Sequence, residues 1–481
     1  MAGGLTVEGG RIADLGPPSG PARPLPAGAV VLPGFVDPHL HVLAMAAART
    51  SVDCGPGAAP TLAALAGALA RAAGEGQGWL RGVGFDDALV ADRRSPGRAM
   101  LDAVARGRPL VVHAATGTVA YLNTAALHAL GVDAARDDGT PGVERDRSGA
   151  ATGEVSKRSP LLDGVPPLPA EVFDAALGGV AADLVRSGVT AVTDATVTNG
   201  PADLDRLAAW SERSGGAPRV TAMVGAARLG EWRGRESGGA EAPSRVTVRH
   251  AKIVVEDDDP PDLASLVEAA RRAGLAVALH VTDIDALDRA LDALGPPEAV
   301  APGEARPRAP GGGRPAPDRL EHVSLCLPEQ VGAIAASGAA VVTQPAFMAE
   351  RGAKYAEQLS AVEQAWLYRV RSFLDAGVVV AASSDAPVVA ATPLASMAAA
   401  IDALVPEERV GVEMALQMVT AGGAAVSGDR GGVLRLGGPA DLVVLAADPR
   451  RVAPADLAAV PVLATVVAGR VVHAAGDLGW G

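Results

Sequence analysis

Two kinds of hydrophobic pattern alternate along most of this chain. From about residue 171 onward, short runs of apolar and β-branched residues are followed by segments in which apolar residues recur every three or four positions. The first pattern predicts buried β-strands and the second predicts amphipathic α-helices. The predicted strands are 189–197, 219–227, 246–256, 276–281, 319–325, 339–345 and 378–387, and the predicted helices are 170–187, 201–213, 262–273, 283–294, 328–337 and 360–376. With one more strand before residue 42, these eight strands, each followed by a helix, predict an α/β protein built on a (β/α)8 TIM barrel.

Both ends of the chain carry a different pattern, with short β-branched runs and glycine turns. LTVEGGRIADLG predicts a β-hairpin that turns at Gly9-Gly10, and DLVVLAADPR and VLATVVAGRVVH predict further short strands near the other end. Two remote ends that are both rich in strands predict a small β-sandwich assembled from both termini. The expected domains are residues 1–33 and 426–481 for the sandwich and 34–425 for the barrel.

Two stretches interrupt the regular rhythm of the barrel. Residues from about 55 to 170 form an insertion that begins with an alanine-rich helix over 61–73. Between the fifth and sixth strands, residues 295–317 are rich in Pro, Gly and Ala. This composition predicts a mobile loop, and its position at the rim of the barrel is equally consistent with part of a lid.

Composition and charge narrow the range of partners. Hydrophobic residues make up 49% of the chain, which is enough for a large core, and the net charge of −13 argues against nucleic acid as a partner. The two cysteines, Cys54 and Cys326, do not form a disulfide framework. No signal peptide and no membrane-length apolar run is apparent, so we expect a cytoplasmic protein that does not enter a membrane.

The stretch VVLPGFVDPHLHV, residues 30–42, holds the first candidate chemistry. Asp37, His39 and His41 occur at every second position, so they share one face of a strand. Two imidazoles about 6–7 Å apart along a strand can chelate one ion. Chance or core packing explains the bare His-x-His pair equally well. Its position at the C-terminal end of an apolar strand favours a metal site, because barrel enzymes place their chemistry there.

Lysine is rare in this chain, which holds 42 lysines and arginines together but lysine only at Lys157, Lys252 and Lys354. A retained lysine points to a task that guanidinium cannot perform, such as losing its proton and reacting. The alternative is that biased codon usage left these three lysines at random, which explains the presence of any one of them just as simply. Position in the chain therefore has to decide, and Lys252 lies near the end of a predicted barrel strand.

Polar residues near the C-terminal ends of the predicted strands form an unusual set. Four of the eight histidines fall there, whereas His113 is interpreted as structural and His250, two residues before Lys252, is a less favoured alternative ligand one layer deeper. Such a set suits two borderline cations such as zinc. A charged lysine amine has no lone pair for a metal ion, so this lysine fits only if it is modified. Its neutral amine can add carbon dioxide to give a carbamate that bridges the two ions. The candidate ligands are His39, His41, Lys252, His280, His322 and Asp385.

The segments PGFVDPHLHV, KIVVED, RLEHV and SSDAP, together with the Trp-x-x-Gly-x-Gly-aromatic-Asp segment of the insertion, resemble the amidohydrolase superfamily. The order of the insertion is similar to family 3, the group that includes N-substituted formamide deformylases. Three departures affect substrate contacts: Thr118 stands where the family usually has His, Glu256-Asp257 replaces Asp-Gly, and a Gly-Asp pair is missing after His280.

The resemblance implies a binuclear centre in this chain. His39, His41 and Asp385 would bind one divalent ion, His280 and His322 the other, and N6-carboxylated Lys252 and a hydroxide would bridge them. Zinc is the default metal by ligand type, and the resemblance is compatible with a homodimer.

The reaction implied is hydrolysis of an amide or formamide-like C–N bond in a small molecule. The bridging hydroxide would attack the carbonyl carbon, while Asp385 would accept a proton and pass it to the leaving amine. Rim position alone suggests the walls of the substrate pocket, namely Phe85, Asp86, Tyr121, Gln344, Pro345 and Phe347.

Three other functions stay open at this point. A mononuclear deaminase of the same superfamily has no use for a bridging lysine, so Lys252 argues against it. A cyclic amidase similar to hydantoinases or dihydroorotases keeps the same ligands and differs only in its pocket. An inactive metal-binding relative is kept open by Thr118 and by the altered loop after the fifth strand. The substrate itself is not identified by any sequence feature.

Overall fold

The computed structural model describes residues 4–17, 22–74, 78–115, 117, 119–156, 159–215, 218–236, 246–255, 262–295 and 316–478. The chain divides into two compact units, residues 1–42 with 178–481 and residues 43–177. The first holds the barrel and the terminal strands, and the second is the insertion. Within the described segments, no helix has the length and apolar character needed to cross a membrane.

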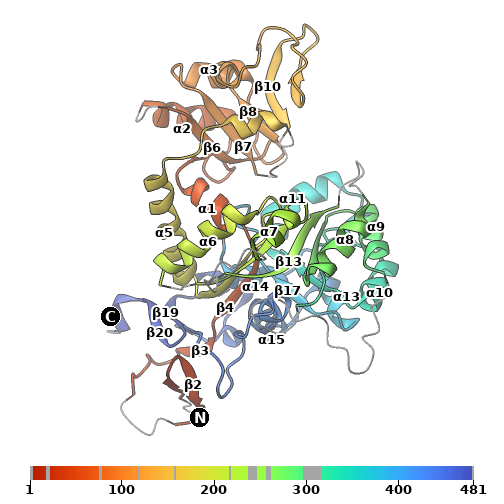
Figure 1. Cartoon of the computed structure of the whole chain (residues 1–481). Coiled ribbons are helices and arrows are strands. Elements are labelled where there is room, and N and C mark those ends of the chain that lie inside the picture. The colour runs from red at the N-terminus through yellow and green to blue at the C-terminus, as the bar shows by residue number, and fades with distance from the viewer. Residues whose placement is uncertain are drawn as a thin grey trace. The chain divides into compact units, whose positions relative to one another are not determined.

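An eight-stranded parallel sheet forms the centre of the first unit (Figure 1). Its strand order is β17-β16-β15-β14-β13-β12-β11-β4, so each strand pairs with the next strand of this sheet along the chain. This order confirms the predicted TIM barrel. The strands are β4 (Phe35–Leu40), β11 (Val189–Asp194), β12 (Arg219–Gly225), β13 (Thr247–Val254), β14 (Ala276–Val281), β15 (Arg319–His322), β16 (Ala340–Thr343) and β17 (Val380–Ala382).

Hydrogen bonds close the ring between its first and last strands. The Asp385 backbone N–H donates to the His39 carbonyl over 2.8 Å, and the His41 N–H donates to the Ala386 carbonyl, also over 2.8 Å. Strands β4, β11, β15 and β16 are buried along their whole length. Burial on both faces explains the nearly continuous apolar run of β16, AVVT, whereas β4 and β15 carry buried polar side chains among their apolar ones.

Helices cover the outside of the barrel and pack against its strands (Figure 1). In α9 the buried positions Ala286, Leu287, Ala290 and Leu294 form one apolar stripe, and Asp283 caps its first turn by accepting from the Ala286 N–H. The helices of this unit are α5 (Ala170–Arg186, which begins in the insertion), α6 (Pro201–Arg213), α7 (Leu229–Glu236), α8 (Leu263–Arg272), α9 (Ile284–Leu294), α10 (Pro328–Ser337), α11 (Pro345–Gln358), α12 (Ala361–Gln364), α13 (Val370–Asp375), α14 (Pro393–Ile401), α15 (Val412–Gln417) and α16 (Gly423–Ser427).

The prediction of a single helix over residues 360–376 is wrong. The structure has two short helices there, α12 and α13, and it also has α11, which was not predicted. Tyr368 lies between the two short helices with φ of 45°, outside the helical region, and Leu367 forms an isolated bridge with Leu325. These backbone conformations interrupt the helix, although the spacing of apolar residues over 360–376 continues through this point.

Two predicted strands also end sooner than expected. The strand expected to reach residue 325 stops at His322, and the one expected to reach 387 stops at Ala382. His322 has φ of 71° and Asp385 has φ of 57°, so both have left the extended conformation. Most of the Pro/Gly/Ala-rich stretch, together with Thr118 and Glu256-Asp257, lies outside the described residues.

The two ends of the chain share one antiparallel sheet of order β20-β19-β18-β3. Its strands are β3 (Val30–Pro33), β18 (Leu442–Leu445), β19 (Val462–Val467) and β20 (Arg470–Ala474). The predicted hairpin, β1 (Thr6–Glu8) and β2 (Arg11–Asp14), packs on this sheet through Ile12, which is fully buried with Leu442 and Val466. Pairing of β3 with β18 confirms that the small β-sandwich is built from both termini. The exact domain boundaries stay a prediction.

Gly34 joins this small sheet to the barrel. A Cβ atom at this position would lie 2.3 Å from the side chain of Thr190, so no larger residue fits without movement. The predicted Pro33-Gly34 turn therefore allows β3 to pass directly into β4, the strand that carries the histidine pair.

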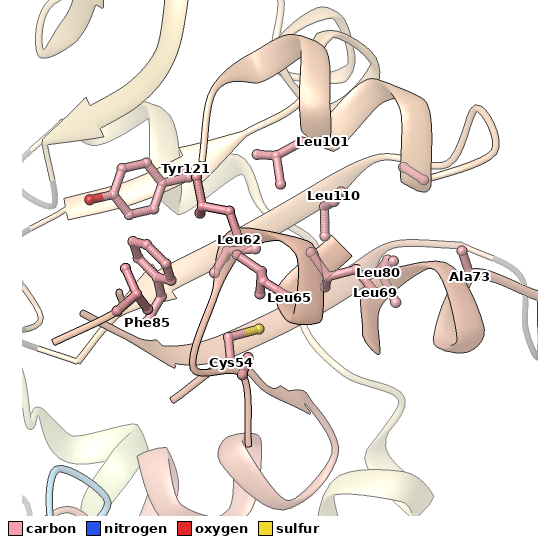
Figure 2. Close-up of a cluster of buried hydrophobic side chains, with 14 residues drawn as sticks. Cys54, Leu62, Leu65, Leu69, Ala73, Leu80, Phe85, Leu101, Leu110 and Tyr121 are labelled. Atoms are coloured by element: carbon pink, nitrogen blue, oxygen red, sulfur yellow. The ribbon is translucent and has the colours of Figure 1, made fainter. Parts of the chain in front are cut away.

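The inserted unit is a second α/β layer with a sheet of order β5-β6-β7-β8-β10-β9. Leu65 and Leu69 of one helix pack against Phe85, Leu110 and their neighbours to form its core (Figure 2). Its elements are α1 (Val42–Arg49), β5 (Val52–Asp53), α2 (Leu62–Gly74), β6 (Leu80–Phe85), α3 (Arg98–Val104), β7 (Leu110–Ala114), β8 (Val119–Leu122), α4 (Thr124–Ala129), β9 (Val143–Arg145) and β10 (Ala151–Ser156).

We expect Phe85→Ala to destabilise the inserted unit by about 3–5 kcal/mol, because it empties a packed position. Phe85 is fully buried and its ring lies 5.4 Å from that of Tyr121, edge to face. Calorimetric melting should show the loss, and Phe85→Leu, which fills most of the space, should show a smaller one. Normal melting with a raised KM would instead support the sequence-based expectation that Phe85 lines the substrate pocket.

Candidate metal centre

The C-terminal ends of the barrel strands bring the predicted ligands together. His280 on β14 lies beside Glu321 in the register with β15, and His322 lies beside Val281. Ring centroids are 4.3 Å apart for His280 and His322 and 5.0 Å apart for His39 and His322. Ligand atoms of three buried residues lie within 4.8 Å of one another and can hold a metal ion: His39, His322 and Asp385.

Asp385 follows β17 and turns its carboxylate onto the histidine pair of β4. Its Oδ1 is 2.9 Å from His41 Nε2 and 3.4 Å from His39 Nε2. Burial alone would raise the pKa of Asp385, but the interaction with His39 and the hydrogen bond from His41 hold that pKa well below its usual value. Asp385 is therefore an anion at the centre of the cluster.

Hydrogen bonds on the far side of three rings fix their orientation. His39 Nδ1 lies 2.5 Å from Glu321 Oε2, His41 Nδ1 lies 2.9 Å from Thr196 Oγ1, and His322 Nδ1 lies 2.7 Å from Gln344 Oε1. A carboxylate or amide oxygen only accepts, so Nδ1 of His39 and of His322 carries the proton. Their Nε2 atoms are left with lone pairs for a ligand, an arrangement typical of metal-binding histidines.

The buried imidazoles are neutral. Burial lowers the pKa of His39 to about 3, and it also lowers the pKa values of His280 and His322. Neutral imidazoles and a carboxylate are the donor set that zinc and similar divalent ions prefer. The residues present therefore fit a metal ion.

Lys252 lies on β13 with its side chain buried. Its Nζ has no hydrogen-bond partner among the residues that the structure describes. Burial is the main cause that lowers the pKa of this amine to about 8, and the amine charge acts on His39, His280 and His322. An unpartnered ammonium beside neutral imidazoles is unfavourable, whereas a neutral or modified amine is compatible with this environment.

A buried ion pair supports His39 from inside the barrel. Arg319 and Glu321 are both fully buried, and Arg319 donates through Nε to Glu321 Oε1 and, over 3.0 Å, through Nη2 to Glu321 Oε2. Arg319 also donates to the Pro38 carbonyl over 2.7 Å. Burial would raise the pKa of Glu321, but Arg319, His39 and Lys252 bring it well below its usual value. Sequence reasoning missed this pair, although positions 319 and 321 share one face of a strand.

We expect Glu321→Ala to lower stability by about 3–5 kcal/mol, because it leaves the Arg319 charge buried and unpaired. It should also weaken metal binding about 10- to 100-fold, because His39 Nδ1 loses its acceptor. Glu321→Gln is the matched control: its amide oxygen still accepts from His39, so metal affinity should largely return while the destabilisation persists. Unfolding and competition with a chelator measure the two effects separately, and unchanged metal affinity in Glu321→Ala would contradict this role.

The other residues singled out from the sequence are placed as follows. His250 is fully buried and its Nε2 contacts the Pro317 carbonyl at 3.1 Å. Gln344 is fully buried between His322 and Ser383, to whose Oγ it donates over 2.9 Å, and Phe347 packs beneath the Arg351 guanidinium. Pro345 begins α11.

The remaining pocket candidates belong to the inserted unit. Phe85 lies in the core of that unit, Tyr121 accepts from Ser95 Oγ over 3.2 Å, and buried Asp86 accepts from the Ala88 N–H over 3.0 Å. A role for any of these residues in substrate binding stays a prediction.

Comparison with known proteins agrees with this geometry. The chain is 29% identical to an N-substituted formamide deformylase of Arthrobacter pascens, over 97% of this chain and 94% of that protein. It is 25% identical to the putative amidohydrolase YtcJ of Bacillus subtilis, over 93% and 89% of the two chains. A metal-dependent hydrolase of Pyrococcus horikoshii, uncharacterised and 22% identical, has the same fold with a TM-score of 0.70 over 94% of this chain and 95% of its own. The model of the amidohydrolase family matches residues 27–473, and this chain therefore belongs to that family.

Proposed function

We propose that this hydrolase cleaves the C–N bond of an amide or formamide-like small molecule with two divalent metal ions and a carboxylated Lys252. One observation carries the proposal: a buried lysine amine without a hydrogen-bond partner in the described structure, next to neutral imidazoles. A carbamate on this amine replaces an unfavourable ammonium with an anionic ligand that has two oxygen donors.

The proposal assigns the six candidate ligands to two ions. His39, His41 and Asp385 would hold one of them, because Asp385 Oδ1 already contacts both Nε2 atoms. His280 and His322, whose rings are 4.3 Å apart, would hold the other, with carboxylated Lys252 shared. Zinc is the proposed metal, and such ions would acidify a water molecule and polarise a carbonyl.

The chain's own groups then move the protons. Asp385 would accept a proton from the attacking water and deliver it to the departing amine nitrogen, since a carboxylate in this position can serve both steps. Thr196, Glu321 and Gln344 hold the imidazoles in place throughout. Phe85, Asp86, Tyr121, Gln344 and Phe347 remain the proposed substrate contacts.

The proposed substrate class follows from one of the relatives that match along nearly the whole chain. That protein is named an N-substituted formamide deformylase, so N-substituted formamides are the first compounds to assay. Longer N-acyl amines and cyclic amides complete the panel, because they share the bond and differ only in the groups a pocket must accept.

Metal content by inductively coupled plasma mass spectrometry tests the proposal. Protein produced with zinc and bicarbonate should contain about two ions per chain, and Lys252→Arg, which cannot form the carbamate, should contain clearly less. Formamide hydrolysis should fall with the metal content. About one ion per chain, unchanged in the variant, would overturn the shared ligand, and full metal occupancy without turnover on the panel would overturn the reaction.

A further inference from the structure

A cavity of about 610 Å³ opens at the N-terminal end of the barrel strands. Arg219 is the first residue of β12 and Thr247 the first of β13, and both line it. Lys252 lies farther along β13, beside Gly225 at the end of β12. The cavity is therefore at the opposite end of the barrel from the metal centre, and its volume falls in the range of small-molecule sites.

The lining of this cavity is strongly basic. It includes four arginines and one acidic residue, Asp429, in a chain whose net charge is −13. Asp429 pairs with Arg219 at 2.6 Å, and Asp441 also pairs with Arg219. Both carboxylates pair with Arg219, and the charge of Asp429 also acts on Arg249. The four are Arg11, Arg219, Arg249 and Arg430.

Arg249 provides an independent sign that a ligand belongs here. Its side chain is only 6% exposed, and its Nη1 has no hydrogen-bond partner among the described residues. Burial and the charge of Arg430 lower the pKa of Arg249, whereas the charge of Asp429 raises it. A buried cation with an unused donor is costly, and an anion in the cavity would remove that cost.

We propose that this cavity binds a small polyanion carrying two or more phosphate groups, such as a diphosphate ester. Arginine forks bind phosphate oxygens in pairs, which suits several guanidinium groups around one cavity. Two hydroxyls, of Thr221 and Thr247, line the same wall, as do Gly9, Gly10 and Gly428 at turns where backbone can approach an anion closely. The volume accommodates more than a single phosphate.

Occupation of the site would join two parts of the first unit. Arg11 begins β2 in the terminal hairpin, whereas Arg219 and Arg249 belong to the barrel. A ligand that contacts both would stabilise the folded chain in proportion to its concentration. This inference does not depend on the proposed function.

Isothermal titration with inorganic pyrophosphate at low ionic strength tests the proposal on the metal-loaded protein. We expect saturable binding that weakens with added salt and a rise in melting temperature. Arg249→Gln should weaken binding about tenfold or more. Arg430→Gln, at a more exposed position, gives a second test if Arg249→Gln folds poorly, and Arg206→Gln on the surface of α6 removes the same charge as a control.

Two comparisons show whether pyrophosphate binds in the cavity and whether the cavity prefers phosphate. Pyrophosphate can also bind metal ions, so a His39→Asn variant should retain the binding that Arg249→Gln loses. Equal binding in wild type and in both cavity variants, or loss of binding only in His39→Asn, would overturn the proposal. Tighter binding of citrate than of pyrophosphate would overturn its phosphate chemistry.

Discussion

Replacing Asp385 with asparagine should reduce kcat/KM for the best formamide or amide substrate by about 10²- to 10⁴-fold, the usual contribution of a general acid–base group. The asparagine keeps the shape of the side chain but cannot accept and return a proton. The change is expected to leave the fold intact, because Asp385 has φ of 57° and asparagine tolerates this left-handed region better than most residues.

The measurement has to separate proton transfer from metal binding, since Asp385 is placed to do both. Steady-state kinetics should therefore be recorded with metal in excess, beside the metal content of the purified variant. Asp375→Asn, at an exposed position paired with Arg371, is the matched control and should retain wild-type kinetics. An Asp385→Asn enzyme with more than a third of the wild-type kcat/KM at full metal occupancy would refute the assigned role.

The barrel and its candidate ligands could be predicted because both depend on local patterns. Runs such as AVALHV carry a polar residue close to the point where a parallel strand ends, and in a barrel all such ends meet at one rim. His280 and His322 were located in this way, and the structure brings them together. The same reasoning selected Lys252 and Asp385, which are buried in the structure, and their role as ligands stays a prediction.

Contacts between remote segments could not be predicted in that way. Ser384 donates to Asp37 across 347 positions of sequence, and no periodicity relates the two. Phe85 is fully buried in the core of the inserted unit, and alternation in its strand does not identify which face is covered; its expected contact with the substrate stays a prediction. The early ends of two strands depend on left-handed backbone at non-glycine residues, His322 and Asp385, for which residue type gives little warning.

We expect Lys252→Ala to abolish measurable hydrolysis and to reduce metal content below that of the wild type. The substitution removes the group proposed as the shared ligand and leaves a space in a buried site. Short carboxylates such as acetate or propionate fit that space and offer the same pair of oxygen donors as a carbamate. Adding them with zinc should therefore restore part of both the metal content and the activity.

Rescue distinguishes a ligand from a residue that only fills space. Propylamine at the same concentration matches the part of the side chain that is removed but offers no oxygen donors, so it should not rescue Lys252→Ala. Lys354→Ala on α11 removes a lysine far along the chain and should behave as wild type. If acetate has no effect on Lys252→Ala, or if that variant keeps its metal and activity, the carbamate is refuted. Rescue by acetate alone would show that this position must supply oxygen ligands, which an unmodified lysine cannot do.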